Sequence, residues 1–312
     1  MADKKAVVVC LNPAIDQTGS LQKLEVGELN RVHSDNTIPG GKGVNVASVL
    51  SQIGAEVTLT GFIGADNAEM FEQMFMQHGI TDEMLRVEGS NRTNLKLTDA
   101  DGQLTEINFS GFTLPASTLD KLGQLLSGLA RTHKTFIFSG SLPNGVSAIR
   151  LAGWIHFLVM QGKTVVFDAS GDAFDKGVKA LPSMVKPNLY ELSGWIGKPL
   201  TSEAEVLQHG AEIAALGIKD VVVSCGAQGV LWLRNGEWMR SIPPEVNVVN
   251  SVGAGDTLVA GLCWGKINSW SQSKTLKFST ALAAHAVSEA GVEIPEAVLL
   301  RKLVTQTTVK PV

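Results

Sequence analysis

The chain has 312 residues, of which 44% are hydrophobic and 18% charged, and its formal net charge is −4 at pH 7. This composition indicates a well-filled core and excludes an intrinsically disordered chain. Scattered basic residues argue against a nucleic-acid-binding surface, and no apolar run approaches the ~18–20 residues of a membrane span. The start of the chain, up to Asn12 and Pro13, is typical of a first strand and not of a signal peptide. Neither nucleic acid nor a membrane is therefore expected as a partner.

Short apolar, β-branched runs alternate with stretches of helical period along the chain. The predicted strands cover 6–10, 57–60, 135–138, 164–167, 184–186 and 221–225, and the predicted helices cover 44–53, 68–78, 116–130, 148–161, 189–196 and 203–216. This alternation predicts an α/β fold with a mainly parallel central sheet covered by helices on both faces. The loops after the strands should then share one edge of the sheet, where open α/β sheets bind ligands.

Two segments, 16–38 and 92–111, interrupt the α/β alternation. They are alternating or turn-rich, and Asp101-Gly102 predicts a hairpin turn between two strands. We expect a small separate sheet, formed by insertions at about residues 13–38 and 91–112 of one domain that spans residues 1–312. A mere extension of the sheet edge, without a catalytic role, is the alternative. The tail from residue 305 to 312 is expected to be loose.

The cysteines and histidines give little indication of a special site. Cys10, Cys225 and Cys263 are far apart in apolar stretches, so we expect buried thiols in a reducing cytoplasm. The six histidines show neither an HExxH pattern nor a cysteine partner at metal-ligand spacing.

Two glycine-rich segments each open an apolar helical pattern. PGGKGVNVA, at 39–47, carries Lys42 and Asn45, and NSVGAGDT, at 250–257, ends its run of small residues at Asp256. Small residues let a ligand approach the backbone, and a helix that begins there presents N–H groups to an anion. Asp256 is placed to take a proton from an attacking hydroxyl, although an N-cap in a tight turn would look the same. Neither segment is a Walker loop or a dinucleotide fingerprint.

Seven motifs in chain order resemble those of one family. They are LNPAIDQT, GGKGVNVA, NRTNLKLT, SGSLPNGV, VKPNLYEL, SCGAQG and VGAGD. In this order they resemble the ribokinase-like (PfkB-type) carbohydrate kinases, and most of all the bacterial 1-phosphofructokinase branch. The resemblance implies a three-layer α/β/α fold whose small β-sheet forms a lid over the sugar site. It also implies phosphoryl transfer from ATP with Mg²⁺, and in some relatives a monovalent cation such as K⁺, whose ligands the spacing does not reveal.

The resemblance assigns Asp256 as the general base, and its position at a helix N-terminus should keep the carboxylate ionised. The anion hole for the transferred phosphoryl group would be formed by backbone N–H groups of Gly253, Ala254, Gly255 and Asp256. The predicted nucleotide contacts are Lys186, Asn188, Ser224, Gly226, Ala227, Gly229, Ser251 and Val252. Asn188 and Glu191 would hold Mg²⁺ through water, because magnesium keeps several waters and takes few carboxylates. Their spacing equally fits a helix capping box.

On the sugar side, the resemblance implies hydroxyl contacts from Asp16, Gly40, Gly41 and Asn45, although surface-charge and N-cap roles fit Asp16 and Asn45 as well. Ser139 would line the same pocket, or form only a structural turn. A phosphorylated sugar also needs a cation. The candidates, in falling order, are Arg92, whose guanidinium can bind phosphate in bidentate fashion, then Lys42, and then the solvated lid charges Arg31 and Lys96.

The expected reaction converts fructose 1-phosphate and ATP into fructose 1,6-bisphosphate and ADP in the cytoplasm. Kinases of tagatose 6-phosphate or fructose 6-phosphate are the near alternatives. A non-catalytic sugar-phosphate-binding regulator is the alternative of another class, and the intact Asp256 argues against it. A homodimer paired through the lid is the expected assembly.

Overall fold

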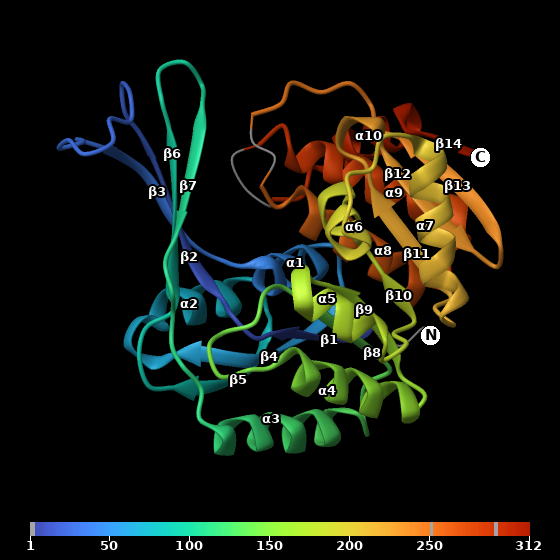
Figure 1. Cartoon of the computed structure of the whole chain (residues 1–312), viewed down its shortest axis with the longest axis horizontal. Helices are drawn as coiled ribbons and strands as arrows, with labels where there is room; N and C mark the ends of the chain where they lie inside the picture. The colour runs from blue at the N-terminus through green and yellow to red at the C-terminus, as the bar shows by residue number, and fades with distance from the viewer. Residues whose placement is uncertain (1–3, 250–251, 290–292) are drawn as a thin grey trace.

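The computed structural model describes residues 4–249, 252–289 and 293–312, and the described residues form two β-sheets (Figure 1). The strands of the large sheet are β1 (Lys5–Cys10), β4 (Glu56–Gly64), β5 (Thr81–Val87), β8 (Thr135–Ser139), β9 (Thr164–Asp168), β10 (Met184–Val185), β11 (Asp220–Ser224), β12 (Val230–Arg234), β13 (Glu237–Ile242) and β14 (Thr308–Pro311). Their order is β14-β13-β12-β11-β10-β9-β8-β1-β4-β5, and the run from β11 to β5 is parallel throughout.

Helices cover both faces of this sheet. They are α1 (Lys42–Gln52), α2 (Glu69–Gln77), α3 (Ala116–Leu129), α4 (Ala148–Met160), α5 (Gly171–Val178), α6 (Leu189–Ile196), α7 (Glu203–Ala215), α8 (Ala254–Ile267), α9 (Gln272–Ala286) and α10 (Ala297–Gln306). The central strand β1 shows the two-residue period directly, because Val7 and Val9 belong to one core with α3, α4 and α5. Ala6 and Val8 belong to the other core, with α1, α2 and α8. The three-layer α/β/α prediction is confirmed.

The predicted elements all occur, within a few residues of their predicted ends. Sequence analysis did not identify β5, α5, β12, β13, α9, α10 and β14. The prediction of a loose tail is wrong: Thr308–Pro311 forms β14, an antiparallel edge strand paired with β13. This pairing satisfies backbone groups that a free tail would leave to solvent. No helix within the described ranges is long and apolar enough to cross a membrane.

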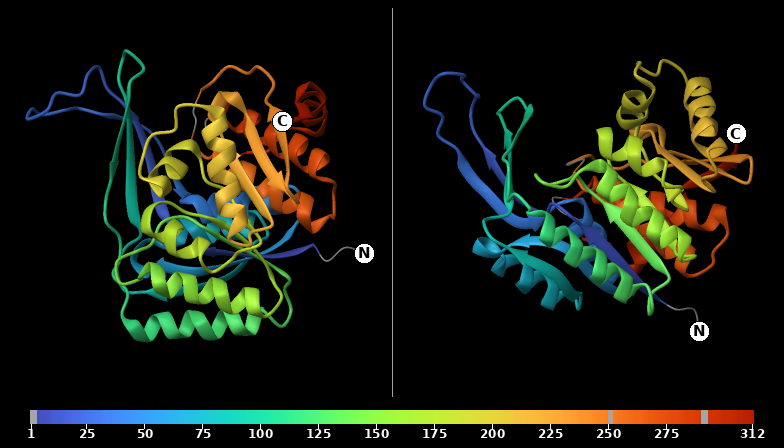
Figure 2. Two further views of the ribbon diagram at one scale, coloured as in Figure 1. Left: turned by 45° about the vertical axis from the view of Figure 1, so that its right-hand side comes forward. Right: turned by 60° about the horizontal axis from the view of Figure 1, so that its bottom comes forward.

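The small sheet contains β2 (Ala14–Ser20), β3 (His33–Gly40), β6 (Arg92–Thr98) and β7 (Leu104–Asn108), in the order β3-β2-β6-β7. β6 and β7 fall within the predicted segment 92–111, whereas β2 begins two residues before the predicted segment 16–38 and β3 ends two residues after it. Gly102 has a φ of 79° in the turn between β6 and β7, as the Asp-Gly pair predicts. The small sheet projects away from the helices of the large sheet in every view, with its two loops farthest out (Figures 1 and 2).

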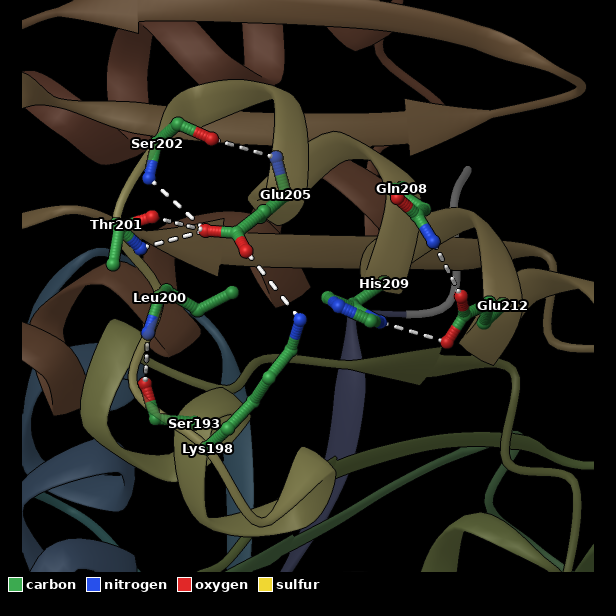
Figure 3. A network of polar contacts seen from close by, with 9 residues as sticks. All are labelled: Ser193, Lys198, Leu200, Thr201, Ser202, Glu205, Gln208, His209 and Glu212. Atoms are coloured by element: carbon green, nitrogen blue, oxygen red, sulfur yellow. Dashed lines mark hydrogen bonds and ion pairs between the residues drawn. The ribbon is translucent and has the colours of Figure 1, made fainter.

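Polar side chains fix the chain where it passes from α6 into α7 (Figure 3). Ser202 and Glu205 form a capping box: the Ser202 hydroxyl accepts from the Glu205 N–H, and the Glu205 carboxylate accepts from the Ser202 N–H. The Glu205 carboxylate also accepts hydrogen bonds from Thr201 and Lys198. These contacts start α7 at a defined residue, beside the strand β11 that leads to one of the predicted nucleotide loops.

Candidate active site

Two helices that carry predicted site residues begin at glycines. Gly41 caps α1 with a φ of 97° and Gly253 caps α8 with a φ of 80°, a region that glycine adopts readily. Neither glycine has a side chain that could cap the first helical turn, so the first N–H groups of these helices are left for another acceptor. The two helices pack against each other, and Asn45 Nδ2 donates to Asp256 Oδ2 over 2.8 Å. The fold therefore brings the two glycine-rich segments together.

Asp256 lies in the first turn of α8 and is only 6% exposed. Burial raises its pKa from 3.8 to about 6; the Lys42 ammonium opposes this rise and the Asp168 carboxylate adds to it. The expectation that the setting at a helix N-terminus would favour the ionised form of Asp256 is wrong in direction, because the pKa is raised and not lowered. The loss of hydration is the largest cause of this rise, and the result is a stronger base than an exposed aspartate.

Asp168 was not identified from the sequence, although it lies at the centre of the charged groups near Asp256. It ends β9 and is 1% exposed. Its Oδ1 lies 3.3 Å from Lys186 Nζ and its Oδ2 lies 3.5 Å from Lys42 Nζ. Burial favours the neutral acid, but the Lys186 and Lys42 ammonium groups outweigh burial and hold the pKa of Asp168 below its ordinary value.

Lys42, the second candidate for the sugar phosphate, contacts two carboxylates. Its Nζ lies 3.1 Å from Glu191 Oε1 and 3.5 Å from Asp168 Oδ2. Its contact with a sugar phosphate stays a prediction. Burial opposes the charge on Lys42, but the Asp168 and Glu191 carboxylates prevail and raise its pKa. Ser139 Oγ likewise donates to Asp168 Oδ2, over 3.3 Å. Lys42 and Ser139 thus both contact the Asp168 carboxylate.

Asn188 and Glu191 form the capping box of α6, the alternative that the sequence left open. Asn188 Oδ1 accepts from the Glu191 N–H over 2.7 Å, and Glu191 Oε2 accepts from the Asn188 N–H over 2.9 Å. Lys42 Nζ donates to Glu191 Oε1, so both carboxylate oxygens of Glu191 already accept a hydrogen bond. Within the described ranges, no group of three or more His, Cys, Asp or Glu side chains could hold a metal ion by itself.

The predicted nucleotide segments lie next to one another. Ser224 N–H donates to the Pro187 carbonyl over 3.1 Å, which joins the end of β11 to the segment of Lys186 and Asn188. Gly226 and Ala227 are exposed in a short turn, and Gly229 closes that turn with a φ of 92°. Of the two remaining predicted contacts, Val252 is half-buried before Gly253, and Ser251 lies outside the described residues.

Asp16, on β2, is buried and receives two hydrogen bonds from the neighbouring strand β6. Asn94 Nδ2 donates to Asp16 Oδ1 and Lys96 Nζ donates to Asp16 Oδ2, each over 2.8 Å. A Cβ on Gly40 would approach the Asp16 carboxylate to 2.9 Å, so this carboxylate faces the glycine turn that leads into α1 through Gly41. The surface-charge alternative for Asp16 is wrong, and so is the expectation that Lys96 is a solvated lid charge.

Arg92 begins β6 and is half-buried at the junction of the two sheets. Its Nη1 donates to Asn94 Oδ1 over 2.9 Å and its Nε donates to the Asn12 carbonyl over 3.5 Å. Burial lowers the pKa of Arg92. The ordinary pKa of a guanidinium is so high that Arg92 nevertheless stays charged. Arg92 thus has donors to spare for an anion beside Asp16.

Sequence signals existed for part of what was missed. Asp168 directly follows the predicted strand 164–167, and small residues follow it, which is where a parallel sheet places site residues. Asn94 and Lys96 alternate on one face of their strand, opposite Asp16 in register. The pairing itself needs the order β2-β6, which the sequence does not reveal.

Comparisons with known proteins show the family of the chain. Residues 6–298 match the model of the pfkB family carbohydrate kinases. The chain is 44% identical to the 1-phosphofructokinase of Vibrio cholerae, over 98% of this chain and 96% of the relative. It is 39% identical to the 1-phosphofructokinase of Escherichia coli, over 99% of both chains.

Solved structures share the fold. That of phosphofructokinase-2 from Escherichia coli in complex with potassium matches with a TM-score of 0.88 at 24% identity, over 98% of this chain and 99% of the other. That of a Thermotoga maritima protein described as a possible 1-phosphofructokinase matches with a TM-score of 0.87 at 24% identity, over 99% of both chains. The sequence matches go beyond the fold, and the chain belongs to the pfkB family of carbohydrate kinases.

Proposed function

We propose that this chain transfers the γ-phosphoryl group of ATP to the free primary hydroxyl of fructose 1-phosphate, which gives fructose 1,6-bisphosphate and ADP. Relatives named 1-phosphofructokinase, similar over nearly the whole chain, support this choice of reaction. The observation that carries the proposal is Asp256: a buried carboxylate with a raised pKa, in the first turn of a helix that begins at a bare glycine.

Asp256 is the proposed general base. With a pKa of about 6 it is mostly ionised at neutral pH, yet it accepts a proton more readily than an ordinary aspartate. Asn45 fixes its Oδ2, which leaves Oδ1 to meet the sugar hydroxyl. The backbone N–H groups from Gly253 to Asp256 are proposed to hold the transferred phosphoryl group, because Gly253 and Gly255 leave room beside the backbone. A Cβ on Gly255 would lie 3.9 Å from Lys186 Nζ, so Lys186 borders the same space.

The residues at Asp168 fit a nucleotide that arrives with its own magnesium ion. Asp168 Oδ1 is buried and accepts no hydrogen bond, although the Lys186 ammonium is near. Asn188 and Glu191 are engaged in their capping box, so we propose that they meet Mg²⁺ only through water. When bound, Mg²⁺ neutralises charge on the β- and γ-phosphates. The turn from Ser224 to Gly229 is proposed to follow the nucleotide with its backbone. A monovalent cation such as K⁺ stays a prediction for this chain, without an assigned ligand set.

The small sheet is proposed to cover the sugar. Asp16 and the backbone of Gly40 and Gly41 would contact the sugar hydroxyls, and Arg92 would bind the phosphate that the substrate already carries. A cover of this kind excludes water from the phosphoryl group and limits wasteful hydrolysis of ATP. We also propose that two copies pair through this sheet, which carries the exposed apolar side chains Leu104, Ile107 and Phe109.

A coupled assay of ADP release tests the proposed reaction directly. The purified chain is given MgATP with fructose 1-phosphate, fructose 6-phosphate, tagatose 6-phosphate or fructose, and ³¹P NMR locates the new phosphate. We expect the highest kcat/KM with fructose 1-phosphate. Faster turnover of tagatose 6-phosphate or fructose 6-phosphate would move the chain to a neighbouring activity. Binding of a sugar phosphate without ADP release would favour the regulator instead.

A further inference from the structure

The ion pair between Asp16 and Lys96 is unusual for a sheet that projects from the body of the protein. Asp16 is 7% exposed and Lys96 is 8% exposed. Lysine is rarely buried without a partner, because the ammonium group loses its hydration. Within the described ranges only one other lysine is buried, Lys186, and it pairs with Asp168 in the large sheet. The small sheet therefore has its own buried cation, matched to its own buried anion.

The register of the small sheet places these side chains on one face. Asp16 on β2 lies opposite Asn94 on β6, and Lys96 is the next residue of β6 on the same face. The two side chains from β6 occupy one oxygen each of the Asp16 carboxylate. Arg92 lies at the other end of the same row and holds Asn94 in place. The formal charge of Asp16, Lys96 and Arg92 together is thus +1.

A buried carboxylate suits the hydroxyl groups of a sugar but repels a sugar that carries a phosphate dianion. In the low dielectric of a covered site this repulsion is much stronger than in water. We propose that Lys96 neutralises Asp16 and thereby determines that the site prefers a phosphorylated sugar to a free one. This inference rests on the proposed function. It gives Lys96 a positioning and specificity-determining role, in which the ammonium acts through the Asp16 carboxylate.

Four forms of the protein test this inference, because they change the net charge of the pair in a defined way. The wild type and the double variant Asp16→Asn/Lys96→Met have a neutral pair, Lys96→Met has a charge of −1, and Asp16→Asn has a charge of +1. The measured quantity is the ratio of the dissociation constant for fructose to that for fructose 1-phosphate, from titration calorimetry. We expect Lys96→Met to reduce this preference about 10- to 100-fold, as the loss of one unit charge in a partly buried site would.

The double variant separates neutralisation from direct contact with the phosphate. We expect it to recover most of the preference that Lys96→Met loses, because its pair is neutral again. It also guards against misfolding, since it leaves no buried charge unpaired. A double variant as poor as Lys96→Met would show that Lys96 itself holds the phosphate, and would overturn the inference. So would an unchanged ratio in Lys96→Met.

Two further arms complete the experiment. Lys96→Arg keeps the charge and should keep the preference, and Lys23→Met, which removes an exposed lysine from the loop after β2, should change nothing. The dissociation constant for MgATP should stay within about twofold in all variants, because the pair lies on β2 and β6 of the small sheet and the predicted nucleotide residues lie at the large sheet. A wild type that binds no sugar phosphate better than its free sugar would contradict the proposed function together with this inference. A wild type with the preference, but variants that do not follow the charge of the pair, would contradict the inference alone.

Discussion

Asp168 at the end of β9 and Asp256 at the start of α8 are both buried aspartates, yet their pKa values move in opposite directions. The pKa of Asp168 is lowered, because the ammonium groups of Lys42 and Lys186 outweigh its burial. The pKa of Asp256 rises to about 6, because its hydrogen-bond partner is the neutral amide of Asn45 and burial prevails. At Asp256 the Lys42 ammonium does not compensate for lost hydration, whereas at Asp168 two lysines within 3.5 Å do.

Because their pKa values differ, the two aspartates suit different chemical roles. The Asp168 region holds permanent charge and suits electrostatic contacts with a nucleotide and its ion. The Asp256 region holds a carboxylate whose protonation changes near neutral pH, which suits proton transfer. The predictions below test whether the two aspartates differ in this way.

The largest effect is expected from Asp256→Asn. The substitution keeps the shape and the acceptor for Asn45 but removes the base, so we expect kcat to fall about 10²- to 10⁴-fold with little change in the affinity for the sugar. Steady-state kinetics and calorimetry measure the two quantities. Asp172→Asn is the matched control, since Asp172 lies exposed in the first turn of α5. A variant of Asp256 that keeps wild-type turnover would refute the role of the base.

The same two aspartates should affect stability with opposite signs. Asp168→Asn leaves two lysines without their partner, and we expect the unfolding free energy to fall by about 3–5 kcal/mol. Asp256→Asn removes a charge that burial disfavours, and at pH 7 we expect a rise of about 1–3 kcal/mol. Denaturant unfolding measures both changes. The variant Asp175→Asn, which removes a half-buried aspartate that pairs with Lys176 and Lys179 at the surface, should change stability by less than about 1 kcal/mol. Equal losses at Asp168 and Asp256 would contradict the comparison.

The dependence of kcat/KM on pH should report the Asp256 carboxyl of the free protein. A raised folded pKa means that the folded chain keeps a proton between pH 3.8 and about 6, where an ordinary aspartate has lost it. We therefore expect kcat/KM to fall about tenfold per pH unit below about 6. The residual activity of Asp256→Asn is the control, and it should lack this acidic limb. A wild-type kcat/KM that stays flat down to pH 4 would be inconsistent with the account.

The smallest effect is expected from Lys42→Met. The Lys42 ammonium lowers the pKa of Asp256, so its removal should move the acidic limb of kcat/KM to higher pH. Lys121→Met, which removes an exposed lysine on α3, should leave the limb in place. A shift of the limb to lower pH would show that Lys42 acts on Asp256 in the opposite sense.

Much of the fold follows from the period of the apolar residues. The parallel strands β1, β4, β8, β9, β10 and β11 were predicted because each is a short apolar run, and most of the helices between them because each is an amphipathic stretch. The parallel strand β5 and the short helix α5 were not identified. The tail was mispredicted because its four-residue strand is formed by pairing with β13 and has no periodicity of its own. Both glycine turns and Asp256 could be predicted, because a glycine-rich segment directly before an apolar helical pattern indicates a helix start with room for a ligand.

The electrostatics of the site could not be predicted from the sequence. The pKa of Asp256 depends on how much water the fold removes, and the partners of Lys42 and Lys96 depend on which strands become neighbours. Lys42 follows the glycine motif of the sugar side in sequence, yet its long side chain reaches Glu191, 149 residues away along the chain. Local sequence defines the backbone of this site, and tertiary structure defines its charges.

The titration of the Asp256 carboxyl in the free protein tests the central claim most directly. ¹³C NMR of aspartate-labelled protein, with the Asp256→Asn spectrum subtracted, isolates this one carboxyl carbon. We predict a midpoint near pH 6, well above the ordinary 3.8. A midpoint below pH 4 would show that the carboxylate stays ionised like a surface aspartate, and would contradict the assignment of Asp256 as a base tuned by burial.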